Sequence, residues 1–497
     1  MRVNLEALPI EVLVGQLFVV AMRRERSLKA AMEDHRKNHY GGIFLRRPNL
    51  RFTDRTRRLT YGFRKHTREV PPILVCVDEE GGLVSSMARL TVPAPSLGLL
   101  GGIDTEDLTR DVHHGIGEKL MALGINTVFG PVLDVNTEAA NPVIGTRSFG
   151  RDPDLVARHG KAALAGLRAA GILSCAKHFP GHGSTRLDSH VTLPQVEDSR
   201  EVLDARDLHP FQEALAGGDP PDLMMTAHVA YRNLDKPGVP ATLSRAIVQD
   251  LLRRELRFQG LVITDSMDMK AIAEHHDPAQ AAIKALEAGV DLLLYGEDAA
   301  LAAQAYAGVL QAVKSKKLSA ERVAESVDRV FRVRDRFRGQ SWIDDNRAEE
   351  ILRFDHDQSF YRAALQGVIL EGNAGALRDL QNQGRKLLVI PREVSRRRLP
   401  LQVVREQLLP AGYRVIETSA VPTEEEVAKA KQSADIADAI VVATASRGSM
   451  PEPTKRMIQT LTTRDVVKVG VALLDPADAD EMAATNCRLK TLGFSGP

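Results

Sequence analysis

Short apolar runs recur along the first three hundred residues, and segments with helical spacing separate them. The runs are 17–22, 43–45, 73–77, 126–129, 172–176, 223–227, 261–264 and 291–294. They lack the polar alternation of a half-exposed strand, which is typical of strands buried on both faces of a parallel sheet. Eight such strands alternating with helices predict a (β/α)₈ barrel of the TIM type.

The segments between the runs support this α/β prediction. Residues 153–170 and 278–288 are rich in alanine, and Gly289 follows the second as a helix stop signal. A doubly wound open sheet is the competing fold. No G-x-G-x-x-G follows the first strand, which weakens that alternative.

The pattern changes after the amphipathic segment 320–338, which we expect to complete the barrel. Residues 340–356 are polar, acidic and basic by turns and contain no proline, so we expect a catalytic barrel over 1–340 and a linker over 341–357. Residues 358–497 then predict a smaller α/β sandwich domain. Its expected strands are 367–370, 386–390, 414–416, 439–443, 467–474 and 489–494, and 424–434 is an expected helix.

Charged or imidazole side chains follow five consecutive strands of the expected barrel, the third to the seventh. They are Asp78, Asp134, Lys177, His178, His228 and Asp265. One such residue is usually a helix cap or a turn former, but capping does not explain five strands in succession. In a barrel all of them lie at the C-terminal rim, where enzymes of this fold carry out their chemistry.

The stretch KHFPGHGSTRLDSH, residues 177–190, is too polar and too rich in glycine to build a core. Its histidines at 178, 182 and 190, with Asp188, are numerous enough to bind zinc. The spacing H-x₃-H-x₇-H matches no compact zinc pattern, however, and Lys177 adds a positive charge. A phosphate-binding loop would need the Walker spacing. We therefore expect neither a metal nor a cofactor.

Carboxylate chemistry fits these residues better. Asp265 ends a strand and faces a pocket that Lys177, His178 and Arg147 would line, so neighbouring cations should keep it ionised. An ionised carboxylate suits a nucleophile, and a proton donor must come from elsewhere. Asp188 lies two positions from His190, close enough to orient its imidazole. On the residues alone, Asp188 is the candidate acid.

The stretch 177–190 closely resembles the K-H-F-P-G-H-G-x-T-x-x-D-S-H signature of the β-N-acetylglucosaminidases of glycoside hydrolase family three. The resemblance extends over the barrel, through VDEEGG (77–82), GPVLDV (130–135), NPVIGTRSF (141–149) and ITDSM (263–267). It is looser over the second domain, which is similar to the C-terminal α/β domain of the peptidoglycan-recycling type.

The resemblance implies a retaining glycosidase with an imidazole acid in place of the usual second carboxylate. Asp265 would attack the anomeric carbon, and His190, oriented by Asp188, would protonate the leaving oxygen. The hydroxyls of N-acetylglucosamine would be held by Asp78, Arg147, Lys177 and His178. The family pattern thus moves the acid role from Asp188 to His190.

Two positions depart from the family pattern. Ser184 stands where the family often has aspartate or asparagine. More seriously, D-x-E-G-G-x-V-x-R ends here in Ser86, so an arginine is missing and one sugar contact is in doubt. Arg89, three residues further on, is the candidate to replace it.

Composition adds limits on partners and compartment. The net charge of +1 gives no reason to expect nucleic acid or an anionic membrane as a partner. Cys76, Cys175 and Cys487 are expected to be buried free thiols, which fits a cytoplasmic protein. The apolar stretch near the N-terminus is too short to span a bilayer. The expected partner is a small glycoside or cell-wall fragment, and the oligomeric state is left open.

Two other functions stay open at this point. Phosphorolysis is a close alternative, because a neutral imidazole repels incoming phosphate less than a carboxylate would. A non-catalytic sugar-binding protein is the other, although Asp265, Asp188 and His190 are all present.

Overall fold

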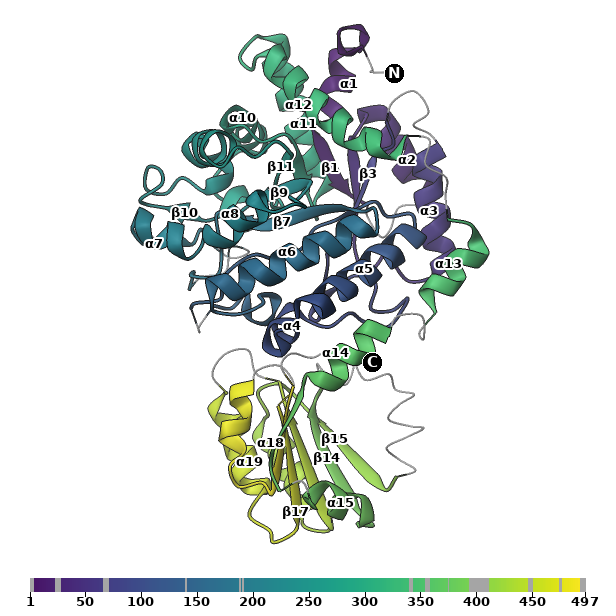
Figure 1. Ribbon diagram of the computed structural model, residues 1–497, viewed down its shortest axis with the longest axis vertical. Helices are drawn as coiled ribbons and strands as arrows, with labels where there is room; N and C mark the ends of the chain where they lie inside the picture. Colours follow the sequence, from purple (N-terminus) through teal and green to yellow (C-terminus); the bar gives the residue numbers. More distant parts are fainter. Residues whose placement is uncertain are drawn as a thin grey trace. The chain divides into compact units, whose positions relative to one another are not determined.

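The computed structural model describes residues 4–22, 28–65, 71–138, 141–186, 189, 192–338, 343–353, 358–373, 375–392, 411–445, 450–472 and 476–491. The chain packs into two compact units, one of residues 1–94 with 104–360 and the other of residues 95–103 with 361–497 (Figure 1). Each unit has its own sheet and its own apolar core.

The first unit is built on an eight-stranded parallel sheet, and each predicted strand is present. The strands are β1 (Phe18–Ala21), β2 (Gly42–Leu45), β3 (Leu74–Val77), β6 (Thr127–Val128), β7 (Leu173–Phe179), β9 (Leu223–Thr226), β11 (Leu261–Thr264) and β12 (Leu293–Tyr295). Their order is β11-β9-β7-β6-β3-β2-β1-β12, so neighbours in the chain are neighbours in the sheet. The (β/α)₈ prediction is confirmed, and the doubly wound alternative is wrong.

The sheet closes between β11 and β12, where the pairing is a single parallel bridge from Ile263 to Leu292. At this junction, side-chain hydroxyls accept backbone N–H groups in place of strand carbonyl oxygens. Thr264 Oγ1 accepts the Leu294 N–H at 3.0 Å, and Ser266 Oγ accepts the Gly296 N–H at 2.7 Å. The two hydroxyls join the last two strands on either side of Asp265.

Helices surround this sheet in Figure 1. Those of the first unit are α1 (Ile10–Gly15), α2 (Leu28–Asn38), α3 (Thr53–Lys65), α5 (Glu106–Ala122), α6 (Pro153–Ala169), α7 (Arg200–Ala205), α8 (His209–Ala216), η4 (Ala246–Glu255, a π-helix), α9 (Lys270–Ala273), α10 (Pro278–Ala288), α11 (Ala299–Lys314), α12 (Ala320–Arg334) and α13 (Asp345–Leu352). Short 3₁₀ turns are η1 (Leu5–Ala7), η2 (Gly145–Arg147), η3 (Ala241–Leu243) and η5 (Asp335–Phe337).

The helix boundaries follow from local sequence signals. Asp277 caps α10 by accepting the N–H groups of Ala279 and Gln280, with Pro278 in the first turn. Gly289 ends the helix with a φ of 114°, a conformation that a side chain would strain. Residues 341–357 were expected to be a linker, but they contain α13, which packs on α5 within the first unit. The division of the chain into domains at 340 and 358 stays a prediction.

Two small sheets lie beside the barrel. In one, β4 (Glu79–Gly81) pairs with β5 (Val84–Ser85) antiparallel, directly after β3. In the other, β8 (Gln195–Val196) pairs with β10 (Ala230–Tyr231) in parallel.

The second unit is a six-stranded sheet with helices on both faces. Its strands are β13 (Val368–Gly372), β14 (Lys386–Pro391), β15 (Tyr413–Thr418), β16 (Ala439–Thr444), β17 (Val467–Ala472) and β18 (Cys487–Thr491), in the order β13-β18-β17-β16-β14-β15. The helices are α4 (Leu97–Ile103), α15 (Gly375–Asn382), α18 (Glu424–Ala434), α19 (Glu452–Leu461) and η7 (Pro476–Met482), and the division between the units falls within α14 (Gln358–Gln366).

Alternation along β14 places two separate cores on the two faces of this sheet. Leu387 and Val389 pack with residues of α18 and α19, whereas Leu388 and Ile390 pack with residues of α15. The smaller α/β sandwich predicted for this region is therefore confirmed.

The three cysteines are buried free thiols, as predicted. Among the described residues, no helix combines the length and the apolar character that a bilayer crossing requires.

Candidate active site

Lys177, near the end of β7 and two residues before Phe179, lies at the centre of an ionic cluster at the C-terminal rim of the barrel. Its buried Nζ contacts Asp78 Oδ1 at 2.8 Å and Glu80 Oε1 at 2.5 Å. Arg147 donates to both oxygens of Glu80, at 2.7 and 2.8 Å. Burial alone would raise the pKa of Glu80, but Arg147 and Lys177 hold it well below its usual range. The cluster therefore contains two anions and two cations that stabilise one another.

His178, the next residue of β7, is oriented by Asp134. Oδ2 of Asp134 lies 2.7 Å from His178 Nδ1, and its Oδ1 accepts the N–H groups of His178 and His182. Burial raises the pKa of Asp134, but the nearby imidazoles and N–H groups lower it more, so the carboxylate is charged. Because Asp134 contacts Nδ1 of His178, the other ring nitrogen, Nε2, is turned away from Asp134.

Asp265 follows β11. Desolvation raises the pKa of this carboxyl, but His178, His228, the Ser266 N–H and Lys177 outweigh it and lower the pKa to about 2. The Ser266 N–H donates to Asp265 Oδ1 at 2.7 Å. Asp265 is thus an ionised carboxylate at neutral pH, stabilised by the N–H of Ser266 and by neighbouring positive charge.

Three polar atoms of this rim have no hydrogen-bond partner among the residues that the structure describes. They are one oxygen of Asp78, one oxygen of Asp265 and Nε2 of His178. They come from the ends of three strands, and His178 and Lys177 are near enough to Asp265 to shift its pKa. The Asp78 oxygen and the His178 nitrogen can bind the hydroxyls of a sugar, and the free oxygen of Asp265 belongs to the ionised carboxylate beside them.

Asp188 and His190, the predicted orienting carboxylate and acid, lie outside the described residues, so their roles stay predictions. Ser189, between them, is described. Its Oγ lies 2.9 Å from His182 Nε2, and its carbonyl oxygen accepts the Ala271 N–H at 3.4 Å. Ala271 belongs to α9, shortly after Asp265, so Ser189 lies beside the segment that follows the expected nucleophile.

His182 is a buried structural residue. Its Nδ1 lies 2.8 Å from Thr185 Oγ1, so both ring nitrogens have hydroxyl partners. Burial, followed by His178, lowers its pKa to about 4, which leaves the ring neutral. Metal ligation would require it to give up one of these bonds.

Two other residues near Asp265 support its loop. His228 Nε2 contacts the Ser266 carbonyl oxygen at 2.9 Å. Asp268 accepts the Ser266 hydroxyl at 2.6 Å and the N–H groups of Glu297 and Asp298. Asp268 therefore joins the loops after β11 and β12.

The sequence did not single out Glu80, and it placed Asp134 at the rim without giving it a role. Glu80 lies in the VDEEGG stretch, and Asp134 was already placed at a strand end, so both signals were present. What the sequence lacked was their contact with Lys177, Arg147 and His178, which only the closed barrel creates.

Glu79 is a buried carboxyl behind this site, and it predicts a dependence of stability on pH. Its Oε2 accepts the Met87 N–H at 2.8 Å, and burial raises its pKa to about 7, above the ordinary value of 4.5. An acid with a raised pKa in the folded state loses stability as pH rises from its unfolded pKa through its folded pKa. Once the pH is above 7, the free energy of unfolding has fallen by about 3 kcal/mol in total for a shift of this size.

Glu79→Gln should remove that loss because glutamine stays neutral and still accepts the Met87 N–H. The variant should melt at the same temperature as the parent below pH 4.5, where Glu79 is protonated in both states, and at a higher temperature at pH 8. Thermal unfolding at both pH values measures this, with the exposed Glu287→Gln as the matched control. Equal melting temperatures at pH 8 would mean that burial does not raise the pKa of Glu79 in the folded protein.

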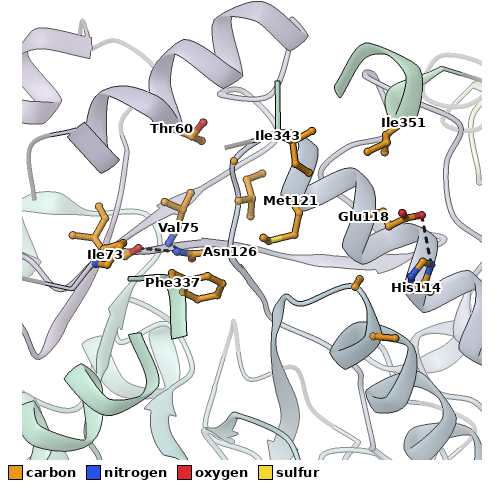
Figure 2. A pocket seen from close by; sticks show the side chains of 15 residues that line it. Thr60, Ile73, Val75, His114, Glu118, Met121, Asn126, Phe337, Ile343 and Ile351 are labelled. Atoms are coloured by element: carbon orange, nitrogen blue, oxygen red, sulfur yellow. Dashed lines mark hydrogen bonds and ion pairs between the residues drawn. The ribbon is translucent and has the colours of Figure 1, made fainter. Parts of the chain in front are cut away.

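A separate cavity of about 230 Å³ lies at the opposite end of the barrel. Figure 2 shows its lining near the starts of strands β3 and β6, where Asn126 bonds the backbone of Ile73 and Val75. His114 and Glu118 face each other at 3.5 Å along another wall (Figure 2). Its position at the N-terminal ends of the strands separates it from the rim cluster.

Comparison with known proteins identifies relatives of the barrel unit. The model of the glycosyl hydrolase family 3 N-terminal domain matches residues 9–333. Beta-hexosaminidase A of Pseudoalteromonas piscicida is 34% identical over 317 residues, which cover 59% of this chain and 53% of that protein. A beta-hexosaminidase of Alkalilimnicola ehrlichii is 37% identical over 260 residues, 51% of this chain and 73% of that protein.

A solved structure matches both units. The family 3 beta-N-acetylglucosaminidase of Paenibacillus sp. FPU-7 is 30% identical, with a TM-score of 0.84, and the match covers 98% of this chain and 94% of that one. By contrast, the chain spans about half the length of the Pseudoalteromonas relative, 53%.

Proposed function

Because the chain belongs to glycosyl hydrolase family 3, we propose that it hydrolyses terminal β-linked N-acetylglucosamine with retention of configuration. The observation that carries the proposal is the ionised Asp265 with a free carboxylate oxygen, next to unpaired polar atoms of Asp78 and His178 within the described part of the chain. The names of its relatives, beta-hexosaminidase and beta-N-acetylglucosaminidase, support the choice of sugar.

In the first step, an Asp265 oxygen attacks the anomeric carbon and the bond to the leaving oxygen breaks. The bonding electrons stay on that oxygen, which takes a proton from His190, oriented by Asp188. In the second step, His190 removes a proton from water, the water oxygen attacks the anomeric carbon, and the bond to Asp265 breaks. Two displacements give the β-configured free sugar.

The ionic cluster supplies the sugar contacts in this proposal. Asp78 and His178 would use their unpaired atoms, and Lys177, already neutralised by two carboxylates, would add an N–H donor. Arg147 is held by Glu80 and the Val143 carbonyl oxygen, so only its remaining N–H groups could bind substrate. Rigid groups of this kind lower the cost of ordering the site when substrate binds.

A direct test is the product formed from an aryl β-N-acetylglucosaminide in phosphate buffer. Hydrolysis gives free N-acetylglucosamine, whereas phosphorolysis would give the sugar 1-phosphate. Failure to release either product would contradict the proposed activity. We place the natural substrates among peptidoglycan fragments in the cytoplasm, on the resemblance to the recycling enzymes.

Preference for the 2-acetamido group is the first consequence for specificity. On a panel of aryl β-glycosides that differ only at C2 and C4, the N-acetylglucosaminide should have the highest kcat/KM. A buried polar contact to the acetamide should separate it from the glucoside by about 10²-fold or more. Faster turnover of the glucoside or the xyloside would contradict the choice of substrate.

A further inference from the structure

Ser189 stands between Asp188 and His190 in the sequence, and it is buried where two loops of the rim meet. Its Oγ lies 2.9 Å from His182 Nε2, and its carbonyl oxygen accepts the Ala271 N–H at 3.4 Å. Only 1% of its surface is exposed. The residue is therefore attached on one side to the loop after β7 and on the other side to helix α9.

The direction of the hydrogen bond between Ser189 and His182 follows from the other partners of the imidazole. The Thr185 hydroxyl donates to the His182 carbonyl oxygen at 3.0 Å, so Thr185 Oγ1 accepts the proton of His182 Nδ1, 2.8 Å away. The ring is neutral, because burial lowers its pKa to about 4. Nε2 therefore carries no proton, and the Ser189 hydroxyl donates to it.

His182 is a well-held acceptor for this bond. Its backbone N–H donates to Asp134 Oδ1 at 2.7 Å, and the side-chain amide of Asn141 donates to its carbonyl oxygen at 2.9 Å. The next residue, Gly183, packs so closely that a Cβ on it would overlap the Val135 carbonyl oxygen. The segment that carries the acceptor nitrogen is thus packed and hydrogen-bonded against the loop after β6.

The carboxylate of Asp134 also connects this segment with His178, an expected sugar ligand. Asp134 Oδ1 accepts the His178 N–H, and Oδ2 contacts His178 Nδ1. The rings of His178 and His182 lie edge to face, with their centroids 5.9 Å apart. Ser189 is therefore bonded to the same framework that orients His178.

We propose that Ser189 is a positioning residue for the proton donor: its bonds to His182 and Ala271 set the place of the backbone that carries Asp188 and His190. The inference rests on the proposed glycosidase activity and adds the residue that ties the acid to the framework of the sugar site. A proton donor must lie about 2.6–3.2 Å from the leaving oxygen. A displacement of about 1 Å therefore removes much of its effect.

Ser189→Ala should weaken protonation of the leaving group and leave the rest of the site intact. Relative to the parent, kcat/KM should fall about tenfold more on an N-acetylglucosaminyl disaccharide than on an activated aryl N-acetylglucosaminide, because the disaccharide depends on the proton. The difference should be smaller than that of His190→Ala. Turnover of the aryl compound also shows that the variant is folded and that its nucleophile works.

Ser326→Ala is the matched control. Ser326 is also buried, and its hydroxyl donates to Asp291 at 2.7 Å, before the start of β12 and at the opposite end of the barrel. Its loss should lower the melting temperature and leave the ratio of the two kcat/KM values unchanged. An equal fall on both substrates in the Ser189→Ala protein would give Ser189 a structural role of the same kind and overturn the proposal.

The acceptor of the bond is tested by His182→Asn. The asparagine amide can still donate to Thr185, but it is too short to reach Ser189, so the variant should change the ratio as Ser189→Ala does. The two changes combined should shift the ratio no further, because both remove the same hydrogen bond. A ratio at the parent value, or additive effects in the double variant, would contradict the inference.

A measurement without turnover separates this proposal from the proposed reaction. Cleavage by trypsin after the exposed Arg186 requires release of the nearby contacts of Ser184, with Asp207, and of Ser189. Mass spectrometry of the fragment that ends at Arg186 isolates this cut from others. It should be about tenfold faster in the Ser189→Ala protein and unchanged by Ser326→Ala.

The two proposals therefore fail in different ways. Faster cleavage in Ser189→Ala, with a parent that hydrolyses neither substrate, would support the anchoring by Ser189 and contradict the reaction alone. Hydrolysis by the parent, with cleavage of Ser189→Ala at the parent rate, would contradict the anchoring alone.

Discussion

Asp265→Ala protein is expected to lose nearly all turnover, more than about 10³-fold in kcat, while keeping its fold and its affinity for ligand. The reason is that, in the described loop after β11, Asp265 keeps one carboxylate oxygen without a hydrogen-bond partner, whereas both oxygens of Asp268 accept hydrogen bonds. Release of aryl aglycone measures turnover, thermal unfolding measures the fold, and calorimetry with N-acetylglucosamine measures affinity.

Asp277→Ala is the control for this experiment. Asp277 also precedes a helix, but its carboxylate is engaged in capping α10. Its loss should cost about 1 kcal/mol of stability and little rate. If folded Asp265→Ala protein kept a tenth of the parent activity, Asp265 would be a capping residue of the same kind.

His190→Ala should reduce the rate far more on a natural disaccharide than on an activated aryl glycoside. A sugar hydroxyl is a poor leaving group and needs a proton, whereas a nitrophenolate leaves with little help. General acid catalysis is worth about 10²–10⁴-fold, and the difference between the two substrates should be of that size. Comparing kcat/KM for both substrates in the parent and the variant measures it.

Asp188→Asn should give the same pattern more weakly, because it misorients the imidazole without removing it. If His190 only packs over the substrate, both substrates should suffer alike, mainly in KM. Equal losses would move the acid role to Asp188, the candidate that the residues alone suggest.

The barrel was predictable because its evidence is local. Strands such as 73–77 and 261–264 are continuous apolar runs, and the segments between them carry their own caps and stops, such as Asp277 and Gly289. Because eight such strands were expected, closure of the sheet into a barrel could be predicted as well. Helix α13 was harder to predict because its surface is polar, and its N-terminal signal, Asp344 three residues before Arg347, is a common turn pattern.

The sequence predicted which residues lie at the rim, but it did not predict which of them pair with one another. Strand ends gave Asp78, Lys177, His178 and Asp265 directly. The contacts of Glu80 with Arg147 join residues 67 positions apart, which no spacing rule connects. His182 lies in the loop after β7, and its burial between Thr185 and Ser189 is a contact that no spacing in the sequence indicates.

The hydroxyls of Thr264 and Ser266 limit which substitutions the chain can tolerate around Asp265. The Thr264 hydroxyl accepts the N–H of Leu294, and the Ser266 hydroxyl accepts the N–H of Gly296. Both N–H groups belong to the β12 side of the closure between β11 and β12. Valine or alanine at these places would leave a buried N–H unpaired, at a cost of about 1–3 kcal/mol each. The residues beside the nucleophile are therefore constrained by the assembly of the barrel as well as by chemistry, and directed evolution of new activities has little freedom at 264 and 266.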